Sequence, residues 1–242
     1  MLLRESLEIP PEKNDVPEAD SSSSSEKLIC VTDHRGTVRE RVGDKLFEYT
    51  AGSFFQNNNS VLVPLTSYVR DAVFSCDPPL DPQPTHLVDA YCGSGLFAIT
   101  LSPQFEKVAG IELSSESIAC ATKNAKLNNF PEGKCSFLEG DAANIFATVQ
   151  DFPRDKTVLI IDPPRKGSDE KFIDQMINFG CKTVVYVSCN VHTQARDIGM
   201  ILKKSEAMEG KKYVLDSVRG FDLFPQTAHV ESVAVLRLVD AS

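Results

Sequence analysis

Short apolar segments alternate with helical segments from residue 85 onward. The segment from Val158 to Ile161 is apolar at every position. A strand of this kind has to be covered on both of its faces, as in a parallel sheet between two layers of helices. The alternation of strand and helix therefore predicts an α/β fold, with a mostly parallel sheet and helices on both faces.

The predicted parallel strands share a short length and an apolar composition, and they are 87–91, 108–112, 135–138, 157–162 and 184–187. Helices are predicted at 96–101, from Ser114 or Ser115 to about 128, at 169–179 and at 193–204. Two more strands, 213–219 and 232–238, follow each other without a helix between them. We expect them to form an antiparallel pair that closes one edge of a seven-stranded sheet.

The part of the chain before residue 85 differs in composition. Residues 1–27 hold three prolines, five consecutive serines and many acids, a composition that predicts disorder, at least over 10–27. Residues 28–84 predict a small region, with a strand at 28–31, a hairpin of 37–41 and 45–49, and a helix at 60–74. A proline-rich stretch ends this region. Residues 85–242 are predicted to form the larger domain.

Composition excludes several classes of protein. The chain has no apolar run long enough to cross a membrane. Its seven cysteines include no C-x-x-C pair, which argues against a disulfide framework and against a metal site. We therefore expect an intracellular protein, cytoplasmic or nuclear, with no membrane or metal partner. The net charge of −9 by itself disfavours nucleic acid as a partner.

A glycine-rich loop follows the first strand of the larger domain. Gly93 and Gly95 lie between this strand and the next helix, where open α/β sheets bind ligands. Asp89 would repel a pyrophosphate but can attract the ammonium group of an amino acid. S-adenosylmethionine carries that ammonium and no phosphate, so it is favoured over NAD. A merely structural turn stays an alternative.

Acids end the next two strands. Glu112 is well placed to accept hydrogen bonds from both ribose hydroxyls of a nucleoside. The alternative is a carboxylate that only stabilises the start of the following helix. Asp141 could accept from an adenine amino group, although acids at strand ends are common.

The candidate chemistry lies after the last two parallel strands and before the final strand. Asp162 leads a turn that Pro163 and Pro164 stiffen, which suits a flat ring beside the methyl donor. Cys189 ends a strand among polar residues, where a thiol can act as a nucleophile. Glu231 has apolar neighbours, and partial burial would raise its pKa and fit it for proton transfer. Each residue can also be explained without a function. Asp162 could belong to a plain turn, Cys189 could be a small buried apolar residue, and Glu231 could be a carboxylate at a strand edge.

Four motifs occur in the order found in the RNA uracil-C5 methyltransferases, and the chain resembles that family. They are D-A-Y-C-G-S-G at 89–95, D-P-P-R-K-G at 162–167, S-C-N at 188–190 and H-V-E at 229–231. F-F-Q-N at 54–57 looks like the family's signature ahead of the Rossmann-like part. The similarity covers about residues 45–239 and is nearest to the eukaryotic tRNA uridine-54 branch.

The resemblance implies a Rossmann-like S-adenosylmethionine-dependent methyltransferase fold that methylates carbon 5 of an RNA uridine, with uridine 54 of tRNA as the expected target. It implies Cys189 as the nucleophile, which adds to carbon 6, and Glu231 as the proton acceptor. The residues implied to bind the methyl donor are Gln56, Tyr91, Glu112 and Asp162. The expected partner is RNA, above all tRNA, and the expected state is a monomer.

Two departures from the family pattern accompany the resemblance. Val191 stands where the family usually has a proline. Members also usually carry an N-terminal RNA-binding barrel, for which this chain has no room, so we expect a catalytic fragment.

Basic residues at 165, 166 and 171 flank the presumed catalytic loop and could meet phosphates despite the acidic total.

Two other functions stay open on the sequence. A cytosine-C5 methyltransferase would use the same addition chemistry, but its nucleophile usually follows a proline, and Cys189 follows Ser188. A non-catalytic RNA-binding or RNA-folding module would have no need for both Cys189 and Glu231.

Overall fold

The computed structural model describes residues 3–8, 27–75, 79–140 and 145–241. Asp141, one of the predicted ligand-binding residues, lies outside these described ranges, as do residues 9–26.

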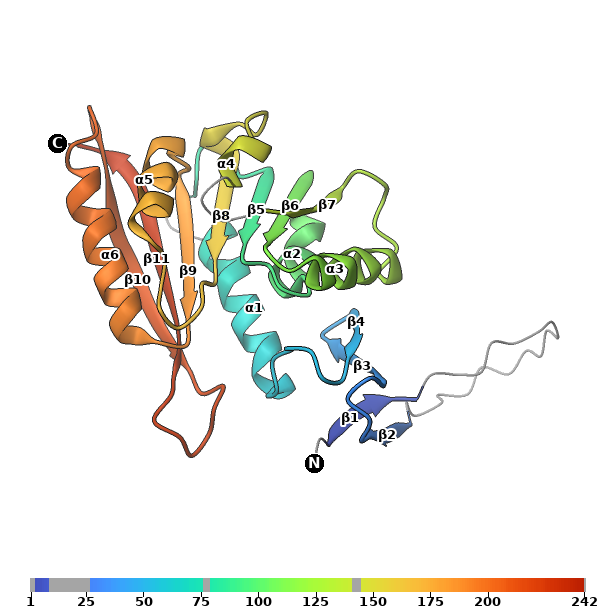
Figure 1. Ribbon diagram of the computed structural model, residues 1–242. Helices are drawn as coiled ribbons and strands as arrows, with labels where there is room; N and C mark the ends of the chain where they lie inside the picture. The colour runs from blue at the N-terminus through green and yellow to red at the C-terminus, as the bar shows by residue number, and fades with distance from the viewer. Residues whose placement is uncertain (1–2, 9–26, 76–78, 141–144, 242) are drawn as a thin grey trace.

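A seven-stranded sheet forms the centre of the molecule (Figure 1). Its strands lie in the spatial order β10 (Lys211–Phe221), β11 (Glu231–Asp240), β9 (Thr183–Ser188), β8 (Thr157–Ile161), β5 (His86–Ala90), β6 (Lys107–Glu112) and β7 (Cys135–Glu139). The pairs from β9 to β7 are parallel, whereas β11 is antiparallel to both β9 and β10. The predicted fold class, including the antiparallel edge pair, is confirmed.

Helices cover both faces of this sheet. They are α1 (Asn59–Phe74), α2 (Leu96–Leu101), α3 (Ser115–Leu127), α4 (Ile145–Thr148), α5 (Glu170–Phe179) and α6 (Val191–Ser205). Alternate residues of β8 point to opposite faces. Val158 and Ile160 belong to a core shared with α1 and α2, and Leu159 and Ile161 belong to a second core shared with α5 and α6. The fully apolar strand is therefore buried from both sides.

Side chains cap the starts of α3 and α5, and one of them, Ser114, is among the caps predicted from the sequence. Ser114 precedes α3, and its side-chain oxygen accepts a hydrogen bond from the backbone N–H of Ser117 at 3.2 Å. Asp169 precedes α5 in the same way and accepts from Phe172 N at 2.7 Å. Each cap satisfies one amide that the helix itself leaves without a partner.

The start of the chain is more ordered than its composition suggests. Residues 4–7 fall in the stretch 1–27 that composition assigns to disorder, but they form strand β1 (Arg4–Leu7), which pairs antiparallel with β2 (Leu28–Val31). Ser6 is buried there, and its hydroxyl accepts from Arg39 N at 2.9 Å. Local composition could not reveal this strand, because its partners lie more than twenty residues away. The domain boundary at residue 84 stays a prediction.

The predicted hairpin, β3 (Thr37–Val42) and β4 (Lys45–Thr50), is attached to the sheet through helix α3. Asn124 Oδ1 accepts from Glu48 N at 2.7 Å. Asn128 accepts from Leu46 N at 3.0 Å and donates to Leu46 O at 2.7 Å. The two asparagines thus take the place of a further strand along β4. Figure 1 shows the hairpin below the sheet, on the side where the loop between β10 and β11 also extends.

None of the described helices is long and apolar enough to span a lipid bilayer.

We predict that Asn124→Ala destabilises the protein by about 1–3 kcal/mol, because Glu48 N is left buried without an acceptor. Urea unfolding measures the effect. Lys126→Ala is the matched control, since Lys126 is exposed on the same helix, and it should change stability by less than about 0.5 kcal/mol. Equal effects of the two changes would contradict the role given to Asn124.

Candidate active site

A cavity of about 690 Å³ lies at the carboxyl ends of the parallel strands. Strand β5 has β6 on one side and β8 on the other, so the order of the strands reverses there, and open α/β sheets bind ligands at this point. The cavity is lined by most of the residues predicted from the sequence: Gln56, Tyr91, Gly93, Glu112, Asp162, Cys189 and Glu231. Gly95 does not line it.

The two glycines of the loop have different roles. Gly95 has φ of 90°, and a Cβ there would lie 2.9 Å from Ile99 Cδ1 and 3.3 Å from Ala121 Cβ. It is therefore needed for the turn and for close packing against α2 and α3. Gly93 has φ of 52°, and a Cβ there would have no neighbour within 4 Å. The open space at Gly93 belongs to the cavity, and a ligand can approach the backbone there.

Asp89 is placed differently from its predicted role. It is fully buried beneath the loop and does not line the cavity. Its Oδ2 accepts from Ala98 N in the first turn of α2 at 2.8 Å, and its Oδ1 has no partner among the described residues. Burial raises its pKa to about 7. Asp89 thus holds the start of α2, and direct contact with the ammonium group of a ligand is not supported.

Glu112 connects the end of β6 to the glycine-rich loop. Its Oε1 accepts from Leu113 N at 2.8 Å and from Ser114 N at 3.2 Å, and its Oε2 accepts from Gly93 N at 3.3 Å. A carboxylate has about four acceptor positions. The Oε2 atom therefore retains a position for a donor from a ligand in the cavity.

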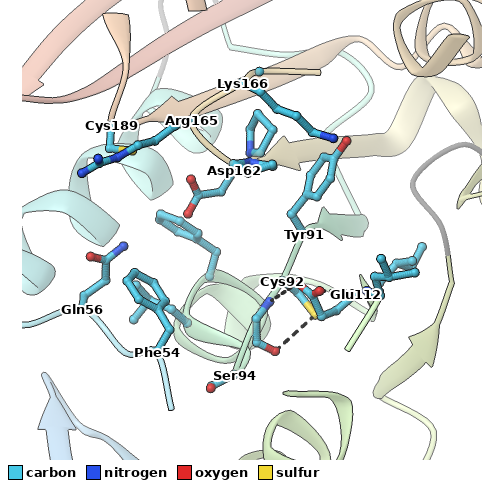
Figure 2. Close-up of a pocket in the computed structure, with 18 of the residues that line it drawn as sticks. Phe54, Gln56, Tyr91, Cys92, Ser94, Glu112, Asp162, Arg165, Lys166 and Cys189 are labelled. Carbon is cyan, nitrogen blue, oxygen red and sulfur yellow. Dashed lines mark hydrogen bonds between the residues drawn. The ribbon is translucent and has the colours of Figure 1, made fainter. Parts of the chain in front are cut away.

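Asp162 and Glu231 are two acidic residues that line the cavity. Figure 2 shows the Asp162 carboxylate pointing into it. Burial raises the pKa of Asp162 well above its usual value, and the carboxylates of Glu231, Asp89 and Glu112 act in the same direction. Glu231, at the start of β11, is only 2% exposed, and burial raises its pKa to about 7. Glu231 is therefore poised to exchange a proton near neutral pH.

Cys189 follows β9 directly and lines the cavity. Burial raises the pKa of its thiol, and the carboxylates of Glu231 and Asp162 raise it further. The guanidinium of Arg165 acts in the opposite direction and favours the thiolate. Arg165 and Cys189 lie next to each other in Figure 2. Arg165 is thus a cation that acts on the thiol, a role that its place in the D-P-P-R motif could have signalled.

Sequence reasoning also missed the aromatic side chains at the cavity. Phe54 and Phe224 line it, and Phe54 is 75% exposed, which is unusual for so large an apolar group. Phe54 and Gln56 lie on the side of the cavity that holds Arg165 and Cys189 (Figure 2). Tyr91 and Glu112 lie on the other side.

Metal ligands do not gather in the described ranges: no group of three or more His, Cys, Asp or Glu side chains there could hold an ion.

The raised pKa of Glu231 gives a prediction about stability. A carboxyl group that titrates at about 7 when folded and at 4.5 when unfolded binds more protons in the folded state between these values. Stability should therefore fall as the pH rises through this window, by about 3 kcal/mol from Glu231. Glu231→Gln should remove this part of the fall in urea unfolding at several pH values. Glu209→Gln, at an exposed acid, should keep the wild-type slope, and an unchanged slope in Glu231→Gln would contradict the prediction.

Comparison with known proteins agrees with the fold and the motifs. The family model for tRNA (uracil-5-)-methyltransferase matches residues 21–239. The chain is 45% identical over 221 residues to the tRNA (uracil(54)-C(5))-methyltransferase of Schizosaccharomyces pombe, covering 91% of this chain and 41% of that protein. It is 46% identical over 210 residues to the Saccharomyces cerevisiae enzyme of the same name, covering 87% and 32%.

A solved structure is also similar. It is the tRNA (uracil-54, C5)-methyltransferase of Pyrococcus abyssi in complex with S-adenosyl-L-homocysteine, with a TM-score of 0.67 and 27% identity, over 90% of this chain and 48% of that one. The chain spans less than half the length of each of these relatives. The family model nevertheless covers most of its residues, and the chain therefore belongs to the tRNA (uracil-5-)-methyltransferase family.

Proposed function

We propose that the chain is the catalytic part of an enzyme that transfers a methyl group from S-adenosylmethionine to carbon 5 of a uridine in RNA, with uridine 54 of tRNA as its target. The observation that carries the proposal is one cavity lined by a thiol, Cys189, and a nearly buried carboxyl group, Glu231. Relatives named for this reaction support the choice of substrate.

The chemistry explains why these two groups are needed together. Carbon 5 of uracil is a poor nucleophile. Addition of the Cys189 thiolate to carbon 6 turns the ring into an enolate, whose carbon 5 can attack a methyl group. The methylated ring still carries its original proton on carbon 5. Glu231 removes that proton, the ring double bond re-forms, and the bond between carbon 6 and sulfur breaks.

The half of the cavity around Gly93 fits the methyl donor. The open space at Gly93 admits a ligand close to the backbone, and Glu112 Oε2 can accept from a ribose hydroxyl. Tyr91 and the apolar side chains of Leu113 and Ile145 also line the cavity and suit a flat, uncharged base. When bound, S-adenosylmethionine supplies the methyl group.

The other half of the cavity fits an extruded nucleotide. Phe54 presents an exposed ring on the side of the cavity that holds Cys189, and aromatic rings stack on unpaired RNA bases. Extrusion of the base costs a few kcal/mol, which such stacking offsets in part. Gln56, assigned to the donor by resemblance, lies on this side as well and offers an amide that can both donate and accept.

We expect S-adenosylhomocysteine, but not NAD, to bind to the chain in calorimetry. Glu112→Ala should weaken binding by about 2–3 kcal/mol, because charge-assisted hydrogen bonds to the ribose are lost. Glu139→Ala is the matched control, since Glu139 ends the neighbouring strand outside the cavity. Binding of NAD alone would refute the assignment of the donor.

Variants at the two catalytic positions should fail at different steps. Cys189→Ala should form no covalent adduct with RNA and transfer no methyl group, because carbon 5 is never activated. Glu231→Gln should still add to carbon 6 and accept the methyl group, and then stall. Loss of a general base slows its step by about 10²–10⁴-fold, so a protein–RNA band that carries methyl label should accumulate on a denaturing gel.

The same gel distinguishes the alternatives. If Cys189→Ala retains turnover, or if the Glu231→Gln adduct lacks the methyl label, the assigned roles are wrong. If both residues are only structural, both variants lose thermal stability and neither traps RNA. Trapping on cytidine in place of uridine RNA would indicate the cytosine-C5 reaction instead.

A further inference from the structure

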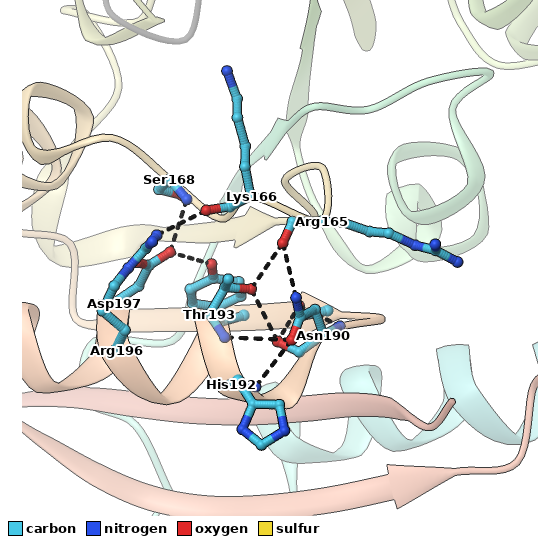
Figure 3. Close-up of polar contacts among 10 residues, drawn as sticks. Arg165, Lys166, Ser168, Asn190, His192, Thr193, Arg196 and Asp197 are labelled. Carbon is cyan, nitrogen blue, oxygen red and sulfur yellow. Dashed lines mark hydrogen bonds and ion pairs between the residues drawn. The ribbon is translucent and has the colours of Figure 1, made fainter. Parts of the chain in front are cut away.

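The turn that carries Arg165 is held by side chains from the start of α6. The Asn190 side chain donates through Nδ2 to Arg165 O at 3.0 Å, and Thr193 Oγ1 lies 3.1 Å from the same oxygen. Asn190 also caps α6, because its Oδ1 accepts from His192 N at 3.1 Å. Figure 3 shows these contacts between the turn and the helix.

Two further contacts hold the next residues of this turn. Arg196 Nη2 donates to Lys166 O at 2.8 Å, and Asp197 Oδ2 accepts from Ser168 N at 2.7 Å. Asp197 is fully buried, and the same Oδ2 atom accepts from the hydroxyl of Tyr186 at 2.6 Å. Its Oδ1 forms an ion pair with Arg196 at 2.7 Å. Three backbone groups of the segment 165–168 are thus fixed by one helix.

The spacing along the helix explains why this is possible. Positions 190, 193 and 197 are three and four residues apart, so they lie on one face of α6. Gly167 fits against this face. Its φ is 79°, and a Cβ there would lie 2.4 Å from Asp197 Oδ2 and 2.6 Å from Arg196 Nη2. Only glycine allows the turn to approach the helix this closely.

The same helix also fixes the position of Cys189. The thiol precedes Asn190, the N-cap of α6, so the helix and the nucleophile cannot move independently. Val191 begins the helix at a position where proline is tolerated. The cap made by Asn190 therefore holds this loop without the family's usual proline.

We propose that Thr193 and Asp197 are positioning residues that hold the turn 165–168 so that the guanidinium of Arg165 stays beside the Cys189 thiol. This rests on the proposed role of Cys189 as nucleophile. Loss of either contact lets the turn move, and Arg165 then no longer favours the thiolate against its neighbours. Burial and the carboxyl groups of Glu231 and Asp162, which raise the pKa of the thiol, are then no longer opposed.

The test is alkylation of Cys189 by iodoacetamide as a function of pH, with the product measured by mass spectrometry of the peptide that contains Cys189. Arg165→Gln sets the scale of the effect. We expect Asp197→Asn and Thr193→Val each to slow alkylation at about pH 7 by about three- to tenfold, with the midpoint of the profile moved to higher pH. Thr193→Val is isosteric and keeps the test usable if Asp197→Asn does not fold.

A double variant and a control complete the design. Arg165→Gln combined with Thr193→Val should show no more than the effect of Arg165→Gln alone, because both act through one group. Ser205→Ala is the control, since Ser205 is buried on the same helix and accepts from Tyr213 N at 3.0 Å, away from the turn. It should lower thermal stability and leave the alkylation profile unchanged.

The proposal is overturned if both positioning variants retain the wild-type profile, or if Arg165→Gln itself does not shift it. It is also overturned if the double variant adds the two single effects. Failure of the proposed function is seen separately on the RNA gel, where Cys189→Ala would retain turnover or Glu231→Gln would trap no methyl-labelled RNA. Alkylation needs neither RNA nor methyl donor, so its outcome does not depend on that result.

Discussion

The structure depends on burying the central strands on both of their faces. Strand β8 offers apolar side chains to two separate cores, and neither layer of helices could cover both. In a parallel sheet that is covered on both faces, the chain leaves every strand at the same end of the sheet and crosses over a face to start the next strand. The loops after β5, β6, β8 and β9 consequently meet at one edge, where they line one cavity.

The same burial creates the electrostatics of that cavity. Asp89, Asp162 and Glu231 lie close to the apolar cores, and their pKa values are raised because the charged forms lose solvation. The pKa of Glu231 is thereby raised to about 7, close to the pH at which proton transfer is efficient. The thiol of Cys189 is affected in the unfavourable direction, and Arg165 is the group that offsets this.

The small N-terminal region completes the cavity from the other side. Asn124 and Asn128 bind the edge of β4 as a neighbouring strand would, and this fixes the segment that follows β4. That segment brings Phe54 and Gln56 to the cavity. The polar contacts of α6 have the equivalent effect on the turn at 165–168. In both cases polar side chains on a helix of the main sheet hold a neighbouring segment in place: α3 holds β4, and α6 holds the turn at 165–168.

Much of this was determined by the sequence itself. The apolar pattern of strands such as Val158–Ile161 determined the sheet and its two covered faces, since the period of the side chains leaves no other way to bury them. The caps at Ser114 and Asp169 determined where helices begin, because those contacts are local. Motif order predicted that Cys189 and Glu231 belong to one site, and both line the cavity although they are far apart in the chain.

Tertiary structure decided what depends on distant contacts. Strand β1 pairs with residues 28–31, and Ser6 in it accepts from Arg39 N, both far away in the chain. Asp89 is turned toward Ala98 and away from the cavity, which its position before the glycines did not indicate. Gly95 serves packing, whereas Gly93 leaves space for a ligand, although both occur in the same motif. Arg165 lies beside Cys189 only in the folded chain, where residues at the start of α6 contact the turn that carries it. Side-chain direction and burial are set by neighbours in space, and a linear sequence does not contain them.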